Sequence, residues 1–289
     1  MGILNETYRL ADGTEIPKLG LGTWLMDDAE AKGAVIDAVK CGYRMIDTAQ
    51  AYGNEAGVGE GVRSCGVARD ELFVASKVAA ELKDYESAKA SIDETLEKMG
   101  LDYLDQMIIH SPQPWVEVNQ SENRYEEGNL AAWRALEEAK AAGKVRVIGV
   151  SNFNGHDLEN IIDNGSVKPQ VNQVLAHISN TLAELIDFCQ KKGILVEAYS
   201  PIAHGMVLTN PLVTEMAAKY GVTPAQLCIR YCLDLGLLPL PKTANAEHMA
   251  NDADVDFEIS DEDLDALENA ERIKDYGASS GFPVYGGRL

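Results

Sequence analysis

The sequence predicts an α/β fold: a single-domain (β/α)8 TIM barrel that spans residues 1–289. Two observations support this prediction. Short apolar runs alternate with longer amphipathic segments, and several runs are apolar almost throughout, as is typical of parallel strands buried on both faces. Eight such runs are present, and eight strand–helix units fit a closed barrel in a chain of this length. The predicted strands are residues 18–22, 44–47, 72–77, 104–109, 145–150, 170–174, 194–199 and 236–240.

The chain begins with a predicted β-hairpin, residues 1–17. Residues 8–10 and 14–16 are short strand-like segments, and Asp12-Gly13 between them is a dipeptide common in hairpin turns. We expect this hairpin to cap the bottom of the barrel.

Helices are predicted between the strands because apolar residues recur there at helical spacing. A glycine just beyond the last turn commonly takes the left-handed conformation that ends a helix. Four predicted helices end in this way, and three of the glycines stand directly before a strand. The helices are residues 29–41, 84–99, 126–142 and 183–192, followed by Gly42, Gly100, Gly143 and Gly193.

An open, doubly wound sheet is the alternative architecture. It requires a glycine-rich phosphate turn after an early strand. The nearest match, residues 57–61, lacks the required glycine spacing and lies in a helix-like segment. The closed barrel is therefore favoured.

Two segments are longer than ordinary connections. Residues 111–128 are mostly polar, and residues 274–289 form a C-terminal tail rich in glycine and aromatic residues. Long connections in compact domains often serve as lids or binding loops, so we expect both to lie near a pocket.

Composition excludes several classes of partner. The net charge is −21, from 25 basic and 46 acidic residues. Nucleic-acid binding needs a basic surface, and anionic membranes repel an acidic protein, so neither partner is expected. No run of apolar residues is long enough for a membrane span, and we expect neither a span nor a signal peptide. We expect a cytoplasmic protein that is a monomer or a weak dimer.

The five cysteines favour the same compartment. They include no CxxC pair, and they are best interpreted as small buried residues in a reducing environment. No metal site is predicted. The cysteines are Cys41, Cys65, Cys189, Cys228 and Cys232.

Four polar residues mark a candidate active site. Asp47, Lys77 and His110 end the second, third and fourth predicted strands, and Tyr52 follows shortly after the second. Active sites of these barrels lie at the carboxyl ends of the strands, so all four side chains should meet at one mouth. A carboxylate, an ammonium, an imidazole and a phenol together can transfer protons.

With these residues, the chain resembles the aldo-keto reductases over nearly its whole length. The resemblance is strongest to the bacterial type that includes 2,5-diketogluconate reductases and prostaglandin F synthases. Many motifs occur in the family's order, which makes the resemblance specific. The matching segments are residues 20–24 (GLGTW), 42–59 (GYRMIDTAQAYGNEAGVG), 101–110 (LDYLDQMIIH), 143–153 (GKVRVIGVSNF), 171–173 (VNQ), 198–205 (AYSPIAHG), 240–243 (LPKT) and 257–264 (FEISDEDL).

The resemblance implies reduction of aldehydes and ketones by hydride transfer from NADPH. Tyr52 would be the general acid, with its pKa lowered by the Lys77 ammonium. Asp47 would hold Lys77 charged and in place, and His110 would orient the substrate oxygen. Two alternatives remain open: a nicotinamide-binding regulatory subunit, and an enzyme of another class in which Lys77 forms a Schiff base.

The resemblance also implies a set of cofactor residues. Ser151, Asn152 and Gln173 would bind the carboxamide, and Tyr199 would stack on the nicotinamide ring. The loop at 200–205 would line the pyrophosphate, and residues near Lys242 would meet the adenosine phosphate. The full set is Gly22, Thr23, Trp24, Asp47, Ser151, Asn152, Gln173, Tyr199, Ser200, Ile202, Gly205, Lys242, Thr243, His248 and Asp252.

Two cofactor positions depart from the family pattern. His248 stands where an arginine usually grips the 2′-phosphate, and Asn251-Asp252 replaces the usual Glu-Asn pair near the adenine. Histidine is mostly neutral at pH 7 and lacks the guanidinium fork. Lys242 remains, so we expect NADPH, with a weakened preference that permits use of NADH.

The substrate side departs as well. Ala79 and Ser111 occupy positions where family members for bulky aldehydes often carry tryptophan. Trp24 is retained, and Trp115 is expected to form a displaced wall of a more open and polar pocket. The predicted substrate-binding residues are Trp24, Tyr52, His110, Ser111 and Trp115.

Overall fold

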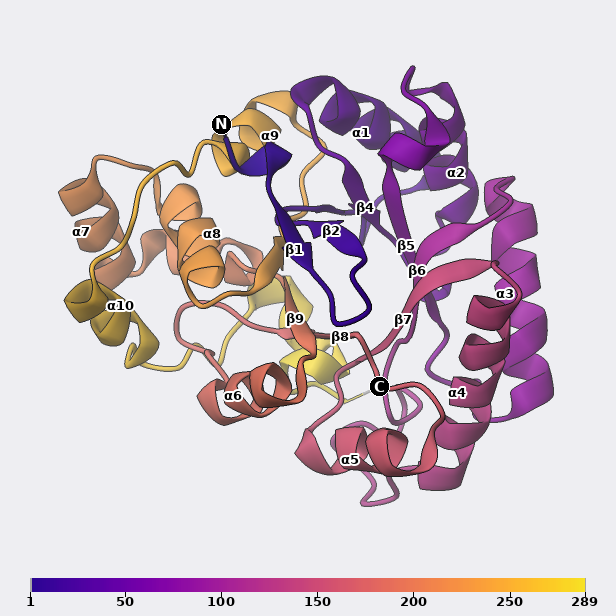
Figure 1. Cartoon of the computed structure of the whole chain (residues 1–289). Helices are drawn as coiled ribbons and strands as arrows, with labels where there is room; N and C mark the ends of the chain where they lie inside the picture. Colours follow the sequence, from indigo (N-terminus) through magenta and orange to yellow (C-terminus); the bar gives the residue numbers. More distant parts are fainter. Residues whose placement is uncertain (1, 289) are drawn as a thin grey trace.

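The computed structural model describes residues 2–288 and shows eight parallel strands arranged as a barrel (Figure 1). Sheet order is β10-β9-β8-β7-β6-β5-β4-β3. The first and last strands meet, because the amide groups of Gly20 and Gly22 donate to the carbonyl oxygens of Pro239 and Pro241 at 3.2 and 2.9 Å. The predicted barrel is confirmed. The strands are β3 (Leu21–Gly22), β4 (Met45–Asp47), β5 (Phe73–Val78), β6 (Leu104–Ile109), β7 (Val145–Ser151), β8 (Val171–Leu175), β9 (Leu195–Tyr199) and β10 (Leu238–Leu240).

Helices surround the barrel and pack their apolar faces against it. The four predicted glycine stops all have positive φ, between 63° at Gly100 and 104° at Gly42. None of the helices within residues 2–288 has the length and apolar character that a membrane crossing requires. The helices are α1 (Asp28–Cys41), α2 (Glu55–Ser64), α3 (Tyr85–Met99), α4 (Glu126–Ala141), α5 (Gly155–Asn164), α6 (Ala183–Lys192), α7 (Pro211–Tyr220), α8 (Pro224–Asp234), α9 (Ala246–Ala253) and α10 (Asp261–Glu268).

The hairpin of β1 (Thr7–Arg9) and β2 (Glu15–Pro17) covers the bottom of the barrel (Figure 1). Leu10 and Ile16 enter an apolar cluster with Phe73, Val171 and Leu238, which begin β5, β8 and β10. The Tyr8 hydroxyl donates to the Leu237 carbonyl oxygen at 2.9 Å, which ties the hairpin to the start of β10. This end of the barrel is closed and apolar, as predicted.

The glycine-rich segment at residues 57–61 lies inside α2 and is not a phosphate turn. A methyl group added at Gly57 would overlap the backbone of Asp28 in α1, and one added at Gly59 would overlap the backbone of Met99 in α3. These glycines therefore allow three helices to pack closely, which removes the main argument for an open nucleotide-binding sheet.

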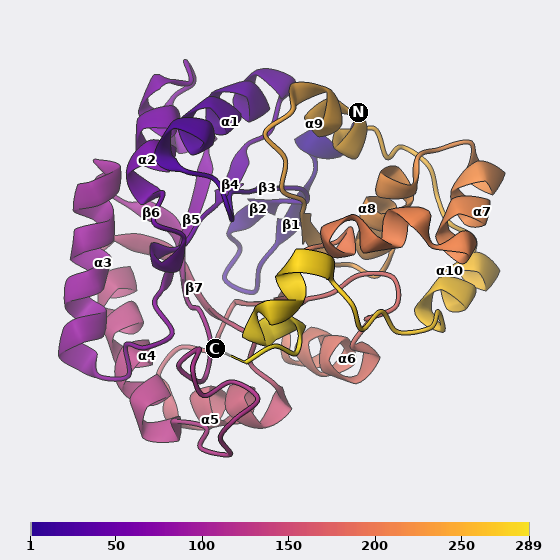
Figure 2. The ribbon, with the colours of Figure 1, turned by 180° about the vertical axis from the view of Figure 1, so that it is seen from behind.

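The opposite end of the barrel is covered by the two long segments. Residues 111–125 form an irregular loop before α4, and the tail folds into the short helices η5 (Gly277–Gly281) and η6 (Pro283–Tyr285). Figure 2 shows the tail, in yellow, lying across this end of the barrel. The Asn119 side-chain amide donates to the Pro283 carbonyl oxygen at 2.7 Å, so the loop and the tail are joined.

Candidate active site

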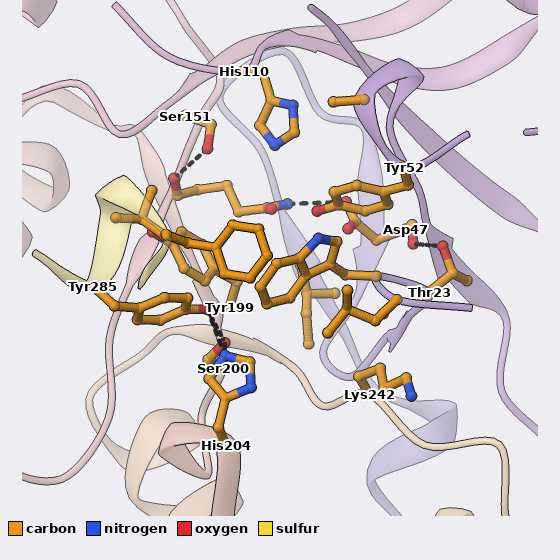
Figure 3. A pocket seen from close by; sticks show the side chains of 18 of the residues that line it. Thr23, Asp47, Tyr52, His110, Ser151, Tyr199, Ser200, His204, Lys242 and Tyr285 are labelled. Atoms are coloured by element: carbon orange, nitrogen blue, oxygen red, sulfur yellow. Dashed lines mark hydrogen bonds between the residues drawn. The ribbon is translucent and has the colours of Figure 1, made fainter. Parts of the chain in front are cut away.

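A pocket of about 510 Å³ opens at the carboxyl ends of the strands (Figure 3). It lies between the barrel mouth, the loop after β9 and the C-terminal tail. Fifteen of the predicted site residues line it. The pocket is lined by Gly22, Thr23, Trp24, Leu25, Asp47, Ala51, Tyr52, His110, Trp115, Ser151, Asn152, Gln173, Tyr199, Ser200, Pro201, Ile202, His204, Gly205, Leu240, Lys242, Phe282, Pro283, Val284 and Tyr285.

The structure brings Asp47, Lys77 and Tyr52 into one connected group. Lys77 Nζ lies 2.6 Å from Asp47 Oδ2, 2.8 Å from the Thr48 carbonyl oxygen and 3.3 Å from the Tyr52 hydroxyl. Lys77 is fully buried behind the pocket wall and reaches it only through Tyr52 and Asp47. This arrangement follows from the parallel pairing of β4 with β5, because residues near the carboxyl ends of parallel strands lie at the same edge of the sheet.

Electrostatics keep Lys77 charged and Tyr52 protonated. Burial alone would lower the pKa of Lys77, but Asp47 and Tyr52 outweigh it and raise that pKa above its ordinary value. Burial also raises the pKa of the Tyr52 phenol, and Lys77 only partly opposes this rise. The expectation of a lowered Tyr52 pKa is therefore wrong for the protein alone, because the desolvation of the phenolate exceeds the attraction of the ammonium.

His110 forms the neighbouring wall of the pocket. Its ring centre lies 5.6 Å from that of Tyr52 and 5.0 Å from that of Trp115, both edge to face. Burial, followed by the charge of Lys77, holds the pKa of His110 well below its ordinary value, so the imidazole is neutral. Its Nδ1 is buried and has no hydrogen-bond partner within residues 2–288.

The loop that carries Tyr52 is fixed by buried polar side chains. Tyr52 ends the short helix η2 (Gln50–Tyr52), and Gly53 follows at a φ of 69°. Asn54 accepts a hydrogen bond from Thr48 Oγ1 at 2.6 Å and donates to the carbonyl oxygens of Thr23 and Met26 at 2.9 and 3.0 Å. These bonds attach the loop to the segment that follows β3. Thr48 and Asn54 both belong to the sequence motif at residues 42–59.

Ser151, Asn152, Gln173 and Tyr199 form a second connected group. Tyr199 donates its hydroxyl proton to Asn152 Oδ1 at 2.8 Å, and Ser151 Oγ donates to the Gln173 backbone carbonyl at 2.8 Å. Asn152 has a φ of 62° and directs its amide to the His110 carbonyl oxygen and to Ser151 Oγ. Their polar groups thus mainly hold one another in place.

Gln173 presents one free polar atom to the pocket. Its Nε2 donates both hydrogens, to Asp47 Oδ1 at 3.0 Å and to Glu197 Oε2 at 2.8 Å. Within residues 2–288 nothing donates to the side-chain carbonyl oxygen, which is therefore available as an acceptor. Two carboxyl groups fix which end of this amide is the donor.

The loop after β9 is attached to the tail. Ser200 Oγ lies 2.9 Å from the Tyr285 hydroxyl, and His204 Nε2 lies 2.6 Å from the same hydroxyl (Figure 3). Trp24 packs edge-on against His204 and Phe282, with ring centres 5.4 and 4.9 Å apart. His204, which belongs to this loop, thus contacts both Trp24 and the tail.

Besides Lys77, four predicted site residues lie outside the pocket lining. Ser111 is buried, accepts a hydrogen bond from Lys83 through its carbonyl oxygen, and lines a neighbouring cavity of about 330 Å³. Thr243 and His248 lie beyond the lining, and His248 is exposed on α9. Asp252, on the same helix, is buried, and burial raises its pKa to about 6.

Aromatic side chains dominate the pocket walls, which contradicts the expectation of a polar pocket. Four of these aromatic residues were among the predicted site residues: Trp24, Tyr52, Trp115 and Tyr199. Phe282 and Tyr285 of the tail had no specific prediction, because the length and composition of the tail suggest that it lies near a pocket but not which of its side chains enter it. Glu197 was missed for a similar reason: one acidic residue in an apolar run carries no signal of its contacts.

Comparisons with known proteins agree with this barrel fold. A profile described as the aldo/keto reductase family matches residues 18–272. The chain belongs to this family and is an oxidoreductase of the NAD(P)H-dependent type. It is 42% identical over 275 residues to the glyoxal reductase of Bacillus subtilis (strain 168), a match that covers 93% of this chain and 95% of that protein.

Solved structures of other aldo-keto reductases have the same fold. An aldo/keto reductase from Brucella melitensis superposes with a TM-score of 0.86 at 36% identity, over 93% of this chain and 98% of the other. The Bombyx mori aldo-keto reductase AKR2E4, solved in complex with NADP, superposes with a TM-score of 0.83 at 31% identity, over 97% and 98% of the two chains.

Proposed function

We propose that the protein reduces aldehydes and ketones to alcohols with NADPH, using Tyr52 as the general acid. The observation that best supports this proposal is the group at the pocket floor: a protonated phenol 3.3 Å from a buried ammonium, which is itself 2.6 Å from a carboxylate. A neutral imidazole stands beside the phenol.

The reaction needs a proton at the carbonyl oxygen as a hydride reaches the carbonyl carbon. When bound, reduced nicotinamide supplies that hydride. Tyr52 donates its phenolic proton to the oxygen, and Lys77 stabilises the phenolate that remains. Asp47 keeps Lys77 charged and directed at Tyr52, and neutral His110 donates a hydrogen bond that orients the oxygen before transfer.

The residues present fit a nicotinamide cofactor. The free carbonyl oxygen of Gln173 is an acceptor suited to a carboxamide, and Tyr199 provides an aromatic face in the same wall. Lys242 is the single lysine or arginine among the described residues that line the pocket, and Figure 3 shows it at the end opposite His110. It would meet the adenosine phosphate, while Ser200, Ile202 and Gly205 would line the pyrophosphate.

The relative named glyoxal reductase suggests a small dicarbonyl as one substrate. The aromatic walls also suit an aromatic aldehyde. We therefore propose that the protein reduces both classes of substrate. We also propose a cytoplasmic location, which is consistent with its free cysteines.

An NADPH-oxidation assay over glyoxal, an aromatic aldehyde and a ketone tests the reaction. The Tyr52→Phe variant keeps the ring and removes the proton, and kcat should fall by about two to four orders of magnitude, the usual contribution of a general acid. The matched control is Tyr103→Phe, because Tyr103 lies outside the pocket. Full activity in Tyr52→Phe contradicts the assignment.

NADPH preference is tested separately at Lys242 and His248. Lys242→Met should raise KM for NADPH by roughly tenfold or more, because a charged hydrogen bond contributes about 1.5–3 kcal/mol, while KM for NADH changes little. If a strong preference for NADPH persists in His248→Ala, His248 has no role in phosphate binding.

The Schiff-base alternative is less well supported. Its nucleophile must be a neutral amine, whereas Asp47 and Tyr52 overcome burial and keep Lys77 protonated. Borohydride trapping of a carbonyl substrate on the protein without nicotinamide would favour it. A regulatory subunit would bind NADPH without oxidising it in the same assay.

A further inference from the structure

Glu197 is a buried carboxyl group that the proposed reaction does not use. It lies on β9, two residues before Tyr199, and is fully buried inside the barrel. Gln173 Nε2 and Gln106 Nε2 both donate to its Oε2, at 2.8 and 3.1 Å. Its Oε1 is buried and has no hydrogen-bond partner in the described part of the chain. A carboxylate with one unsatisfied oxygen is costly to bury, which favours the neutral acid.

One amide connects Glu197 to the proposed catalytic group. Gln173 Nε2 uses one hydrogen for Glu197 and the other for Asp47 Oδ1, 3.0 Å away. Asp47 in turn pairs with Lys77 through its other oxygen. Without an acceptor at position 197, the Gln173 amide can rotate. Asp47 then loses the hydrogen bond from Gln173 that holds its carboxylate against the attraction of Lys77.

The charges that face Glu197 are few. They are Asp47 on β4 and Lys77 on β5, while β6 and β8 provide the neutral amides of Gln106 and Gln173. Apolar residues such as Val147, Leu238 and Leu240 come from β7 and β10. Burial and then Asp47 raise the pKa of Glu197 to about 7, against the two amides and Lys77.

We propose that Glu197 is a positioning residue of the reductase: as a neutral acid it holds Gln173, and through Gln173 it holds the Asp47 carboxylate that pairs with Lys77. Ionisation of Glu197 above neutral pH places a second negative charge behind this pair. That charge makes Tyr52 a weaker acid, and reduction slows. The proposal rests on the function proposed above for Tyr52 and Lys77.

Kinetics across pH 5–9 provide the first test. In the wild type we expect kcat to fall as pH rises through about 7. Glu197→Gln keeps an oxygen that can accept from Gln173 and cannot ionise, so this fall should disappear while kcat at pH 6 stays close to that of the wild type. Glu197→Ala should lower kcat by roughly tenfold to a hundredfold at all pH values, the scale of a misplaced catalytic group.

The control is Glu215→Gln, since Glu215 is exposed on α7. A fall in kcat that persists unchanged in Glu197→Gln, or full activity in Glu197→Ala, overturns the proposal. If Glu197→Ala does not fold, the pH profile of Glu197→Gln still decides.

A second test needs no turnover and no cofactor. The carboxyl carbons of glutamate are labelled with 13C, and the NMR signal lost in Glu197→Gln identifies Glu197. We expect it to titrate near pH 7, above ordinary glutamates at about 4.3, and to titrate at lower pH in Asp47→Asn. Titration with the other glutamates, or no response to Asp47→Asn, overturns the proposal even if the protein reduces carbonyls. The expected titration in a protein without reductase activity would instead contradict only the proposed function.

Discussion

Asn54 shows how one buried side chain fixes the position of another. It is fully buried and joins three backbone or side-chain groups, from Thr23, Met26 and Thr48. Two of its bonds are donated by the side-chain amide to carbonyl oxygens. The Tyr52 loop therefore depends on a donor that only an amide of this size can provide.

Replacing this donor should destabilise the protein. Asn54→Asp keeps the shape but faces the carbonyl oxygens of Thr23 and Met26 with a further oxygen. We expect the free energy of unfolding to fall by about 2–4 kcal/mol, because buried groups lose their partners, and kcat to fall with it. Urea denaturation measures the first effect. The control is Asn164→Asp, since Asn164 is exposed at the end of α5. An equal, small loss in both variants would contradict this account.

Asp252 makes stability depend on pH. Burial raises its pKa to about 6, while Asn251 and His248 oppose the rise. A carboxyl group with a raised pKa in the folded state contributes stability that is present below the unfolded pKa of about 4 and is lost as pH rises through 6.

Asp252→Asn should therefore be more stable than the wild type at pH 8 by about 2–3 kcal/mol and should differ little from it at pH 4. Asp254→Asn, at an exposed position on the same segment, should show no such dependence. Urea denaturation at both pH values measures the difference. An unchanged KM for NADPH in Asp252→Asn would further show that this buried residue does not bind the cofactor.

At the residue level, the sequence predicted which side chains meet but not the direction in which the pKa of Tyr52 shifts. Asp47, Lys77 and His110 were placed correctly because they end parallel strands of one barrel. The raised pKa of Tyr52 depends on how deeply the finished pocket buries the phenol. Glu197 required knowledge of which strands face each other across the barrel interior.

At the level of elements, the strand predictions were close because apolar runs and glycine stops are local signals. Residues 104–109 were predicted, and β6 is Leu104–Ile109. The predicted strand 18–22 proved shorter, since β3 is Leu21–Gly22. The neighbouring strand β10 contains Pro239, which has no amide hydrogen to donate. The hydrogen bonds that close the barrel are therefore donated mainly by Gly20 and Gly22. The tail was expected to lie near a pocket, but its individual contacts join residues far apart in the sequence and no local pattern predicts them.

The packing of α2 provides a prediction at this scale. Gly59 lies against the backbone of Met99, where an added methyl group would overlap. Gly59→Ala should therefore lower the free energy of unfolding by about 1–3 kcal/mol or more, because α2 and α3 must move apart. Gly33→Ala in α1 is the matched control, since its site is open, and it should stabilise the protein by about 0.5–1 kcal/mol. Thermal denaturation compares them; a stabilised Gly59→Ala would refute the packing argument.

For the whole molecule, charge opposes the proposed cofactor. The net charge is −21, while Lys242 is the single lysine or arginine among the described residues lining the pocket. NADPH carries a pyrophosphate and a 2′-phosphate, so its approach is hindered by the long-range field and favoured only by local contacts. The Debye length is about 30 Å at 0.01 M salt and about 8 Å at 0.15 M, so salt screens the distant charges more than the contact at Lys242.

We therefore expect kcat/KM for NADPH to rise as salt increases from 0.01 to 0.15 M, the opposite of the fall seen when a basic surface attracts an anion. NADH lacks the 2′-phosphate and should show a smaller rise. In Lys242→Met the rise for NADPH should persist, because the long-range repulsion is unchanged while the local attraction is lost. Steady-state kinetics at constant pH measure all three series. A steady fall in kcat/KM for NADPH with salt would mean that local cations outweigh the acidic surface, and Lys242 would then have to act with other basic groups outside the pocket lining.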